Sequence, residues 1–268
     1  MLEFTIGSDI EVLLKDNKGI HRSAIGLIGG SKESPRKTTN GYVQEDNVTA
    51  EFNVNPANTR EDFINNTLLI LSDLSDIVHS LDLSIDITPG AFFDPSELNH
   101  SKALLAGCTE DYNAWSLTEN PKPCLYDTTF RSCGGHVHIS FPQANHADPV
   151  MQRVNMVRVM DLVAGVPSVL LDSNTERRKL YGRAGAFRFK FVGNKDPYDG
   201  VEYRTLSNFW LKTPELIGWV YEAVDSAVNN FESLLEIANE NEEDIVSAIN
   251  NSDQELAKSI VKKYKLVI

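Results

Sequence analysis

Four segments of the chain alternate apolar and polar residues, and their polar positions carry side chains that can take part in chemistry. On the first segment Asp9 and Glu11 share the polar side, and on the second Glu45 and Glu51 do so. Because residues two apart on a β-strand point the same way, each segment predicts a strand with one buried face and one polar face. The segments cover residues 4–14, 44–54, 135–141 and 201–206.

The third and fourth segments show the same alternation, and their polar positions carry histidines, an arginine and one more carboxylate. His136 and His138 alternate with apolar residues on the third, and Glu202 and Arg204 do so on the fourth. If the four strands join one sheet whose apolar face lies under helices, the carboxylates, both histidines and the arginine converge on the other face. That combination is typical of a site for metal ions and phosphate groups.

Each polar face taken alone has a simpler interpretation, because the solvent-facing half of an ordinary amphipathic strand is also polar. Like charges side by side destabilise a sheet, however, so acidic residues gathered on several strands favour a bound cation. Carboxylate oxygens suit Mg²⁺, and a histidine makes Mn²⁺ an equally suitable ion. The pattern therefore predicts a divalent-metal site on the polar face.

Three helical regions are predicted around these strands. The first begins at Thr59, where Asp62 three residues later gives a capping-box-like start, and apolar residues recur at helical spacing as far as Leu81. The second covers residues 149–171, and the third covers the C-terminal part of the chain, about 214–268. These helices are expected to cover the apolar face of the sheet.

The chain has no internal repeat, low-complexity tract or clear linker, so we predict a single domain, residues 1–268, of the α+β class. Residues 82–89 predict one more strand. Residues 90–131 are rich in Pro, Asn and Asp, which predicts long irregular connections of the kind that often form functional lids.

Bulk composition argues against several classes of function. The formal net charge of −13 disfavours a general nucleic-acid-binding role, which depends on many Lys and Arg contacts with phosphate. No run approaches the roughly 18 apolar residues of a membrane span, and the start lacks the basic-then-apolar order of a signal peptide. We therefore expect a soluble cytoplasmic protein without nucleic-acid or membrane partners. Cys108, Cys124 and Cys133 show no CxxC spacing and are expected to be reduced thiols.

Arginines concentrate in residues 176–188, just before the fourth strand. This segment holds Arg177, Arg178, Arg183 and Arg188 in a chain that is otherwise strongly acidic. A guanidinium group can hold a phosphate or a carboxylate through paired N–H donors. The simpler alternative is a basic surface loop, but its place beside the predicted carboxylate cluster favours an anion-binding role.

The order of these motifs resembles that of a known superfamily. An acidic pair on an early strand, a Glu-rich second strand, Gly-His-x-His-x-Ser, Arg-x-x-x-x-Arg and Glu-x-Arg are similar to the catalytic series of glutamine synthetases and glutamate–cysteine ligases. Within that superfamily the chain looks like the phage-type COOH–NH2 ligases, also called amidoligases type 2. The match runs from about residue 5 to 212 and rests on residues 7–11, 44–47, 134–138 and 200–208.

The resemblance implies a fold, an activity and cofactors. The fold would be a glutamine-synthetase-like antiparallel sheet with helices packed on one face and an open polar catalytic face. The activity would be ATP-dependent formation of an amide or peptide bond between a carboxylate and an amine, through an acyl phosphate. Two or more Mg²⁺ or Mn²⁺ ions would assist, and the substrates would be small molecules or peptides. A homo-oligomer would be compatible with this family. The protein would act in the cytoplasm, which is the host cytoplasm if the protein is phage-encoded.

The resemblance also implies a role for each motif residue. Two metal sites would be built from carboxylates and a histidine: Glu11, Glu45 and Glu51 in one, and Asp9, His136 and Glu202 in the other. Nucleotide phosphate would be contacted by three arginines: Arg183, Arg188 and Arg204. His138 would be a further nucleotide or substrate contact. The catalytic step would use Glu202, Arg183 and Arg204. Asp9 departs from the Glu that is usual in glutamine synthetases.

Three other functions are compatible with the same residues. A guanidino-kinase-like phosphotransferase would share the metal and arginine residues but form no amide, and a non-catalytic relative would bind nucleotide or metal without turnover. A zinc hydrolase built on His136 and His138 would need no ATP. The sequence has no GxSxG, Walker lysine motif or HExxH, so hydrolase, P-loop and zincin alternatives lose support.

Overall fold

The computed structural model describes residues 4–104, 111–125, 128–141, 148–190 and 200–268. Its centre is a sheet whose main path runs in the order β3-β4-β5-β1-β10-β12-β11-β8. Every neighbouring pair along this path is antiparallel. The strands of the path are β1 (Thr5–Lys15), β3 (Arg36–Lys37), β4 (Tyr42–Asp46), β5 (Thr49–Ala57), β8 (Tyr112–Asn113), β10 (Gly135–Ser140), β11 (Ala186–Lys190) and β12 (Gly200–Tyr203).

Shorter elements complete the β structure near the C-terminal end of β1. β2 (His21–Arg22) and β6 (Ser84–Asp86) both pair with that end of β1, and β6 falls inside the strand predicted for residues 82–89. The segment predicted to be irregular, residues 90–131, contains several brief elements in its described parts. They are β7 (Gly90–Phe92), η1 (Pro95–Leu98), η2 (Ser101–Leu104), β8 and β9 (Phe130–Ser132), with β7 and β9 pairing as a separate small sheet.

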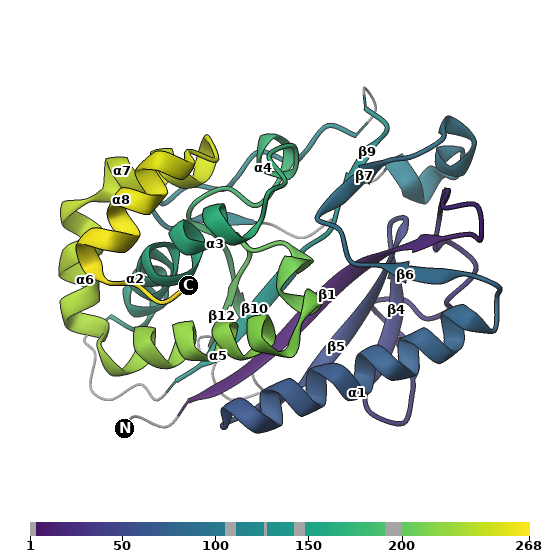
Figure 1. The fold of residues 1–268 in the computed structure, drawn as a ribbon, viewed down its shortest axis with the longest axis horizontal. Coiled ribbons are helices and arrows are strands. Elements are labelled where there is room, and N and C mark those ends of the chain that lie inside the picture. Colours follow the sequence, from purple (N-terminus) through teal and green to yellow (C-terminus); the bar gives the residue numbers. More distant parts are fainter. Residues whose placement is uncertain (1–3, 105–110, 126–127, 142–147, 191–199) are drawn as a thin grey trace.

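Helices pack against one face of the main sheet. Figure 1 shows α1 and α5 lying across that face, while the C-terminal helices gather beside α2 and α3. The helical elements are α1 (Arg60–His79), α2 (Pro149–Met160), η3 (Asp161–Gly165), α3 (Val166–Leu171), α4 (Arg177–Leu180), η4 (Asn208–Lys212), α5 (Pro214–Asn229), α6 (Phe231–Glu240), α7 (Glu242–Asn250) and α8 (Gln254–Tyr264). The predicted α+β class, with an antiparallel sheet and helices on one of its faces, is confirmed.

Helix α1 begins where the sequence predicts. The side chain of Thr59 accepts a hydrogen bond from the backbone N–H of Asp62 at 3.1 Å, which satisfies one of the free donors at the helix start. Phe63 and Leu74 are fully buried against the sheet. The predicted apolar stripe extends too far, because the helix ends at His79 and Leu81, beyond it, is 38% exposed.

The predicted single strand over residues 44–54 is wrong, because the chain folds there into a hairpin of β4 and β5. Asn47 adopts a positive φ of 56° in the two-residue turn, and Asp46 pairs with Thr49. A turn of this length reverses the chain so that position 46 faces the same way as 49 and 51. Even-numbered residues of β4 therefore share a face with odd-numbered residues of β5.

This change of parity moves Glu45 away from the polar face. Glu45 lies opposite Ala50, and its Oε1 accepts a hydrogen bond from the backbone N–H of Gly29 at 2.9 Å. Gln44 and Asp46 take its place beside Glu51. The prediction that Glu45 and Glu51 point together is therefore wrong.

The helix predicted over residues 149–171 is continuous but contains one π-helical turn, η3, at its centre. Asp161 opens this turn and is fully buried. Its carboxylate accepts hydrogen bonds from Trp115 Nε1 at 2.7 Å, from Tyr203 Oη at 2.7 Å and from the backbone N–H of Gly185. Burial raises the pKa of Asp161 to about 6, although these donors oppose the rise. One buried carboxylate thus joins the helical layer to β12 and to the turn before β11.

The same 23-residue stretch is long and apolar enough to cross a membrane by length and composition, so the expectation that no run approaches a membrane span is wrong. Within the fold, 78% of its most apolar window is buried, as in the core helix of a compact domain.

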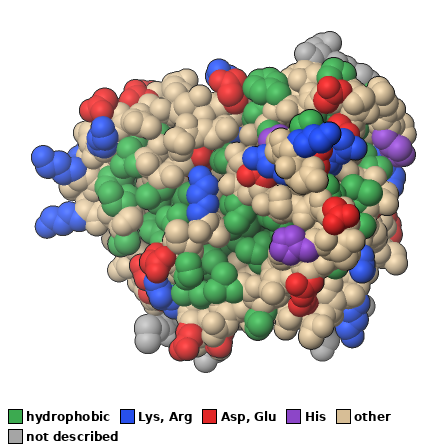
Figure 2. All heavy atoms as spheres, turned by 45° about the vertical axis from the view of Figure 1, so that its right-hand side comes forward, with side chains coloured by type: hydrophobic (Ala, Val, Ile, Leu, Met, Phe, Trp, Pro, Cys, Tyr) green, Lys and Arg blue, Asp and Glu red, His purple; other side chains and the backbone are tan. Residues whose placement is uncertain are grey.

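Figure 2 shows one face of the molecule, on which acidic and basic side chains are interspersed around a central group of hydrophobic ones. Cys133 is a buried free thiol and Cys124 is exposed, and Cys108 lies outside the described residues.

Candidate functional site

Three strands bring Asp9, His138 and Glu202 together on the face of the sheet opposite the helices. His138 of β10 lies opposite Glu202 of β12, and Asp9 of β1 lies opposite the neighbouring His136. His138 Nε2 lies 3.0 Å from Asp9 Oδ2. One ligand atom from each of Asp9, His138 and Glu202 lies within 4.8 Å of the others, which is close enough to hold one metal ion. We call these three residues the Asp9 group.

Two cationic side chains surround the Asp9 group. Lys190 Nζ lies 3.2 Å from Asp9 Oδ2 and 3.4 Å from Glu202 Oε2, and Arg204 Nη1 donates to Glu202 Oε1. Burial alone would raise the pKa of Glu202, but Arg204 and Lys190 outweigh it and hold that pKa well below its usual range. Burial is likewise outweighed at Asp9, whose pKa is lowered by His138 and Lys190. Both carboxylates are therefore ionised near neutral pH.

His136 lies beside the Asp9 group rather than within it. Its Nδ1 is 3.4 Å from Glu202 Oε1, and its Nε2 is 3.5 Å from the hydroxyl of Tyr181. Burial, reinforced by Arg204, lowers the pKa of His136 well below its ordinary value, so its imidazole is neutral. The resemblance implies His136 as the metal ligand and His138 as an outer contact. The geometry instead places His138 in one metal-type group with Asp9 and Glu202, while His136 contacts Glu202 alone among the described carboxylates. In the described part of the chain the two histidines do not share a metal-type group.

Neighbouring positions on the same face form a second cluster, which we call the Glu11 group: Glu11, Asp46 and Glu51. Glu11 lies directly opposite Glu51 across β1 and β5, and Asp46 joins them through the β4–β5 hairpin. One carboxylate oxygen from each residue lies within 4.8 Å of the others. Glu11 Oε2 accepts a hydrogen bond from the backbone N–H of Gly134 at 2.7 Å, and Glu51 Oε1 accepts one from Gln44 at 2.9 Å.

The three carboxylates of the Glu11 group repel one another. Burial, followed by the charge of Asp46, raises the pKa of Glu11 to about 7. Burial and then the charges of Asp9, Asp46 and Glu11 raise the pKa of Glu51 well above its ordinary value. Lys32 is the one cation that forms an ion pair with this group among the described residues, at 3.3 Å from Asp46. Buried like charges with an all-oxygen donor set fit a hard divalent cation.

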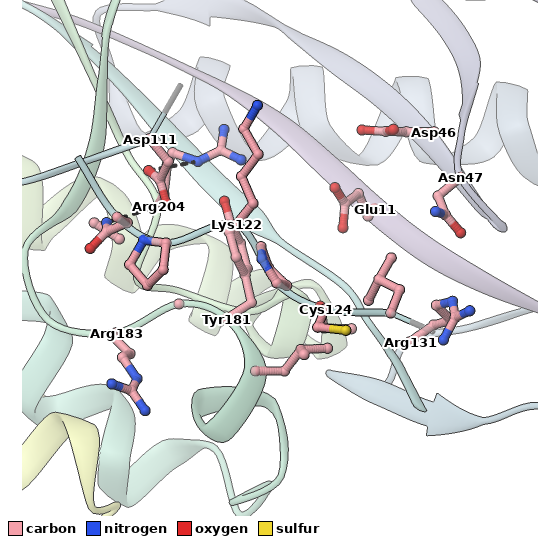
Figure 3. Close-up of a pocket in the computed structure, with 18 of the residues that line it drawn as sticks. Glu11, Asp46, Asn47, Asp111, Lys122, Cys124, Arg131, Tyr181, Arg183 and Arg204 are labelled. Carbon is pink, nitrogen blue, oxygen red and sulfur yellow. Dashed lines mark hydrogen bonds and ion pairs between the residues drawn. The ribbon is translucent and has the colours of Figure 1, made fainter. Parts of the chain in front are cut away.

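A cavity of about 530 Å³ opens between the Glu11 group and the arginines. Figure 3 shows Glu11 and Asp46 on one side of this cavity and Arg204, Asp111 and Arg183 on the other. Residues 120–125 and 179–183 also line it, so the polar face of the sheet is partly covered rather than fully open. Its size falls in the range of small-molecule binding pockets.

The arginines divide into two kinds. Arg188 lines the cavity from β11, and Arg204 lines it from the position directly after β12. Arg183 lines it from the loop before β11, with an exposed side chain. Arg177 is fully buried instead, and its guanidinium donates to three backbone carbonyls at 2.7–2.9 Å: those of Cys133, Thr205 and Leu206. Arg178 is also buried and donates to Ser168 Oγ at 3.0 Å. An anion-binding role for these last two is therefore wrong, because both support the fold.

Several residues at the site were missed by sequence reasoning. Asp46 was hidden by the unrecognised hairpin, for which Asn47, a residue that tolerates positive φ, was the available signal. Lys190 enters through the pairing of β11 with β12. Tyr181 lies under Arg204 and Arg177, with each guanidinium carbon 5.4 Å from the centre of its ring. For Lys190 and Tyr181 the sequence offers no comparable signal.

Comparison with known proteins gives two results besides the absence of any match among curated sequences. The chain is similar to a solved structure of GmaS without ligand (12% identity, TM-score 0.42, 98% of this chain and 70% of that chain). It is also similar to a GmaS/ADP complex (9%, 0.41, 98% and 70%) and to a glutamine synthetase of Plasmodium falciparum (13%, 0.40, 84% and 52%).

The family model for phage phiEco32-like COOH.NH2 ligase-type 2 matches residues 127–267, more than half of the 268-residue chain. The matched part contains His136, His138, Glu202 and Arg204, while Asp9 and Glu11 reach the same site from β1 outside it. The chain therefore belongs to the phage phiEco32-like COOH-NH2 ligase type 2 family.

Proposed function

We propose that this protein is an ATP-dependent carboxylate–amine ligase that activates its carboxylate substrate as an acyl phosphate. The observation that carries the proposal is that two metal-type acidic groups share one sheet face, and the cavity at the Glu11 group is also lined by Arg188 and Arg204. Membership of a carboxylate–amine ligase family supports the type of reaction. A small-molecule or peptide carboxylate and an amine are the proposed substrates.

The proposal gives each acidic group a metal ion. Asp9, His138 and Glu202 would hold one Mg²⁺ or Mn²⁺, and the Glu11 group would hold another. When bound, such ions neutralise phosphate charge and orient the phosphoryl group for transfer. Both groups provide donor atoms within 4.8 Å of one another, so neither requires a large rearrangement to surround an ion.

Arg204 and Arg188 would bind the transferring phosphoryl group. Arg204 is 6% exposed, and contacts with Glu202 and Tyr181 fix its guanidinium group, so little reorganisation is needed when negative charge develops. Arg183 is exposed at the cavity and would contact nucleotide phosphate. A carboxylate is a poor electrophile until its oxygen becomes a leaving group, and phosphorylation supplies that change. An amine then displaces phosphate to form the amide.

The test is to incubate purified protein with ATP, Mg²⁺ or Mn²⁺, and a panel of carboxylates and amines, and to measure ADP together with new amide masses. Glu11→Gln and Glu202→Gln are expected to abolish ADP formation, because each neutralises a carboxylate of one acidic group. Glu45→Gln is the matched control, since Glu45 lies on the opposite face of the hairpin and should leave turnover intact.

Each other outcome identifies a different function. ADP with a phosphorylated guanidine and no amide would indicate a phosphotransferase. Absence of ADP across the whole panel would indicate a non-catalytic relative. Full turnover in both Glu11→Gln and Glu202→Gln would contradict the proposed site.

A further inference from the structure

The ammonium group of Lys190 lies between the two carboxylates of the Asp9 group. Lys190 is the last residue of β11, two residues beyond Arg188, which lies directly opposite Glu202. From this diagonal position its ammonium reaches both carboxylates, at 3.2 Å from Asp9 Oδ2 and 3.4 Å from Glu202 Oε2. One ammonium therefore bridges the two carboxylates whose oxygens would ligate a divalent ion.

We propose that Lys190 is the resident counter-cation of the Asp9 group and that a divalent ion must displace its ammonium to bind there. This inference rests on the proposed function, because it takes the Asp9 group to be a metal site. Lys190 would thereby set the affinity of this one position for metal, and it would keep the group charge-balanced when metal is absent.

The two cations of the Asp9 group differ in their freedom to leave. Arg204 is 6% exposed and its guanidinium lies over the ring of Tyr181, so it is held on several sides. The side chain of Lys190 is 32% exposed and ends a flexible four-carbon stem. Of these two cations, Lys190 is the one that can move toward solvent without leaving a buried charge unpaired.

The Glu11 group has no equivalent cation among the described residues. Its nearest lysine, Lys32, forms an ion pair with Asp46 alone, at 3.3 Å, and its side chain is 43% exposed. Lys32 therefore leaves Glu11 and Glu51 without a direct cationic partner. Competition between an ammonium and a divalent ion is thus expected at the Asp9 group and not to the same degree at the Glu11 group.

The experiment compares Mn²⁺ binding by two proteins, the Glu51→Gln variant and the same variant with Lys190→Met added. Glu51→Gln is present in both because it impairs the Glu11 group. Binding is followed by electron paramagnetic resonance of free Mn²⁺, with no nucleotide or substrate present. Loss of a positive charge a few ångströms from the ion is expected to tighten binding by about tenfold or more. Melting temperature without Mn²⁺ should fall, and Mn²⁺ should restore it.

Lys15→Met in the same background is the matched control. The side chain of Lys15 is 33% exposed and forms one ion pair, with Asp86 at 2.8 Å, so it matches Lys190 in exposure but not in position. This variant is expected to bind Mn²⁺ like the background protein. Binding tightened equally by Lys15→Met would show a general charge effect and would overturn the assignment to Lys190.

A purely structural role makes the opposite prediction for affinity. If Lys190 only ties β11 to β1, Lys190→Met would lower melting temperature and weaken or leave unchanged the binding of Mn²⁺, and the inference would be overturned while the ligase proposal stands. If the Glu51→Gln protein binds no Mn²⁺ with or without Lys190, the metal assignment of the Asp9 group fails in both proposals.

Discussion

The Asp9 group and the Glu11 group share one sheet face and one strand, yet their charge balance is opposite. Asp9 and Glu202 are paired with Lys190 and Arg204, and their pKa values lie below the ordinary range. Glu11 faces two more carboxylates, and its pKa is raised. Asp9 and Glu11 are two residues apart on β1, so the difference comes from the neighbouring strands.

This contrast separates folding from ligand binding. A group with internal cations is stabilised in the folded protein before any ion arrives, since each carboxylate already has a partner. A group of mutually repelling carboxylates is destabilised until a cation arrives. We therefore expect the two groups to respond in opposite directions when one carboxylate of each is neutralised in the metal-free protein.

Glu202→Gln is expected to have the largest effect on the metal-free protein. It removes the nearer of two carboxylate partners of Arg204, which keeps Asp111 at 3.5 Å, and one of two partners of Lys190. Because removing one partner of a buried ion pair leaves the other charge less well compensated, the free energy of unfolding should fall by about 3 kcal/mol. Urea denaturation with a chelator present measures this change.

An exposed ion pair provides the comparison for that variant. Glu176 lies 2.6 Å from Lys179, and both side chains are largely exposed. Glu176→Gln should change the free energy of unfolding by less than about 0.5 kcal/mol, because water screens such pairs. Equal losses in the two variants would refute a stabilising charge balance in the Asp9 group.

The Glu11 group should bind metal in a pH-dependent way. Burial and the charge of Asp46 give Glu11 a pKa of about 7 in the metal-free protein, so a proton competes with the ion below that pH. In an Asp9→Asn background, Mn²⁺ affinity should fall roughly tenfold as pH is lowered from about 8 to about 6. Isothermal titration calorimetry at several pH values measures it, and a flat profile would contradict the raised pKa.

Glu51→Gln should have a smaller effect on folding, of the opposite sign to Glu202→Gln. Removing one of three crowded charges is expected to raise the free energy of unfolding of the metal-free protein by about 1 kcal/mol. The amide oxygen can still accept the hydrogen bond from Gln44. Urea denaturation beside a Glu45→Gln control checks the sign, and destabilisation would mean that repulsion does not dominate this group.

The sequence predicts those features of the site and fold that depend on the spacing of residues close together in the chain. Alternation along β1, β10 and β12 placed Asp9, Glu11, His138 and Glu202 on one face, as the strand pairing has it. The cap of α1 at Thr59 was equally local, because it depends on residues three apart.

The remaining features depend on contacts between distant residues. A two-residue turn at Asn47 exchanges the faces of Glu45 and Asp46, and unbroken polar alternation conceals it. Which histidine completes the Asp9 group depends on the register of β10 against β1 and β12, which the pattern does not give. Arg177 looks like a phosphate ligand in sequence, but it binds backbone carbonyls inside the fold.

The buried carboxylate of Asp161 has a consequence for engineering this protein. It receives hydrogen bonds from Trp115, from the backbone of Gly185, and from Tyr203 and Thr205, the last two flanking Arg204 in the chain. The conformation of the arginine-bearing segment, residues 176–188, therefore depends on Asp161, and the segment cannot be exchanged independently of that residue. A graft of residues 176–188 onto another scaffold would have to include the π-helical turn that carries Asp161. A library of variants in residues 176–188 alone would yield only backbone conformations that keep the hydrogen bond to Asp161.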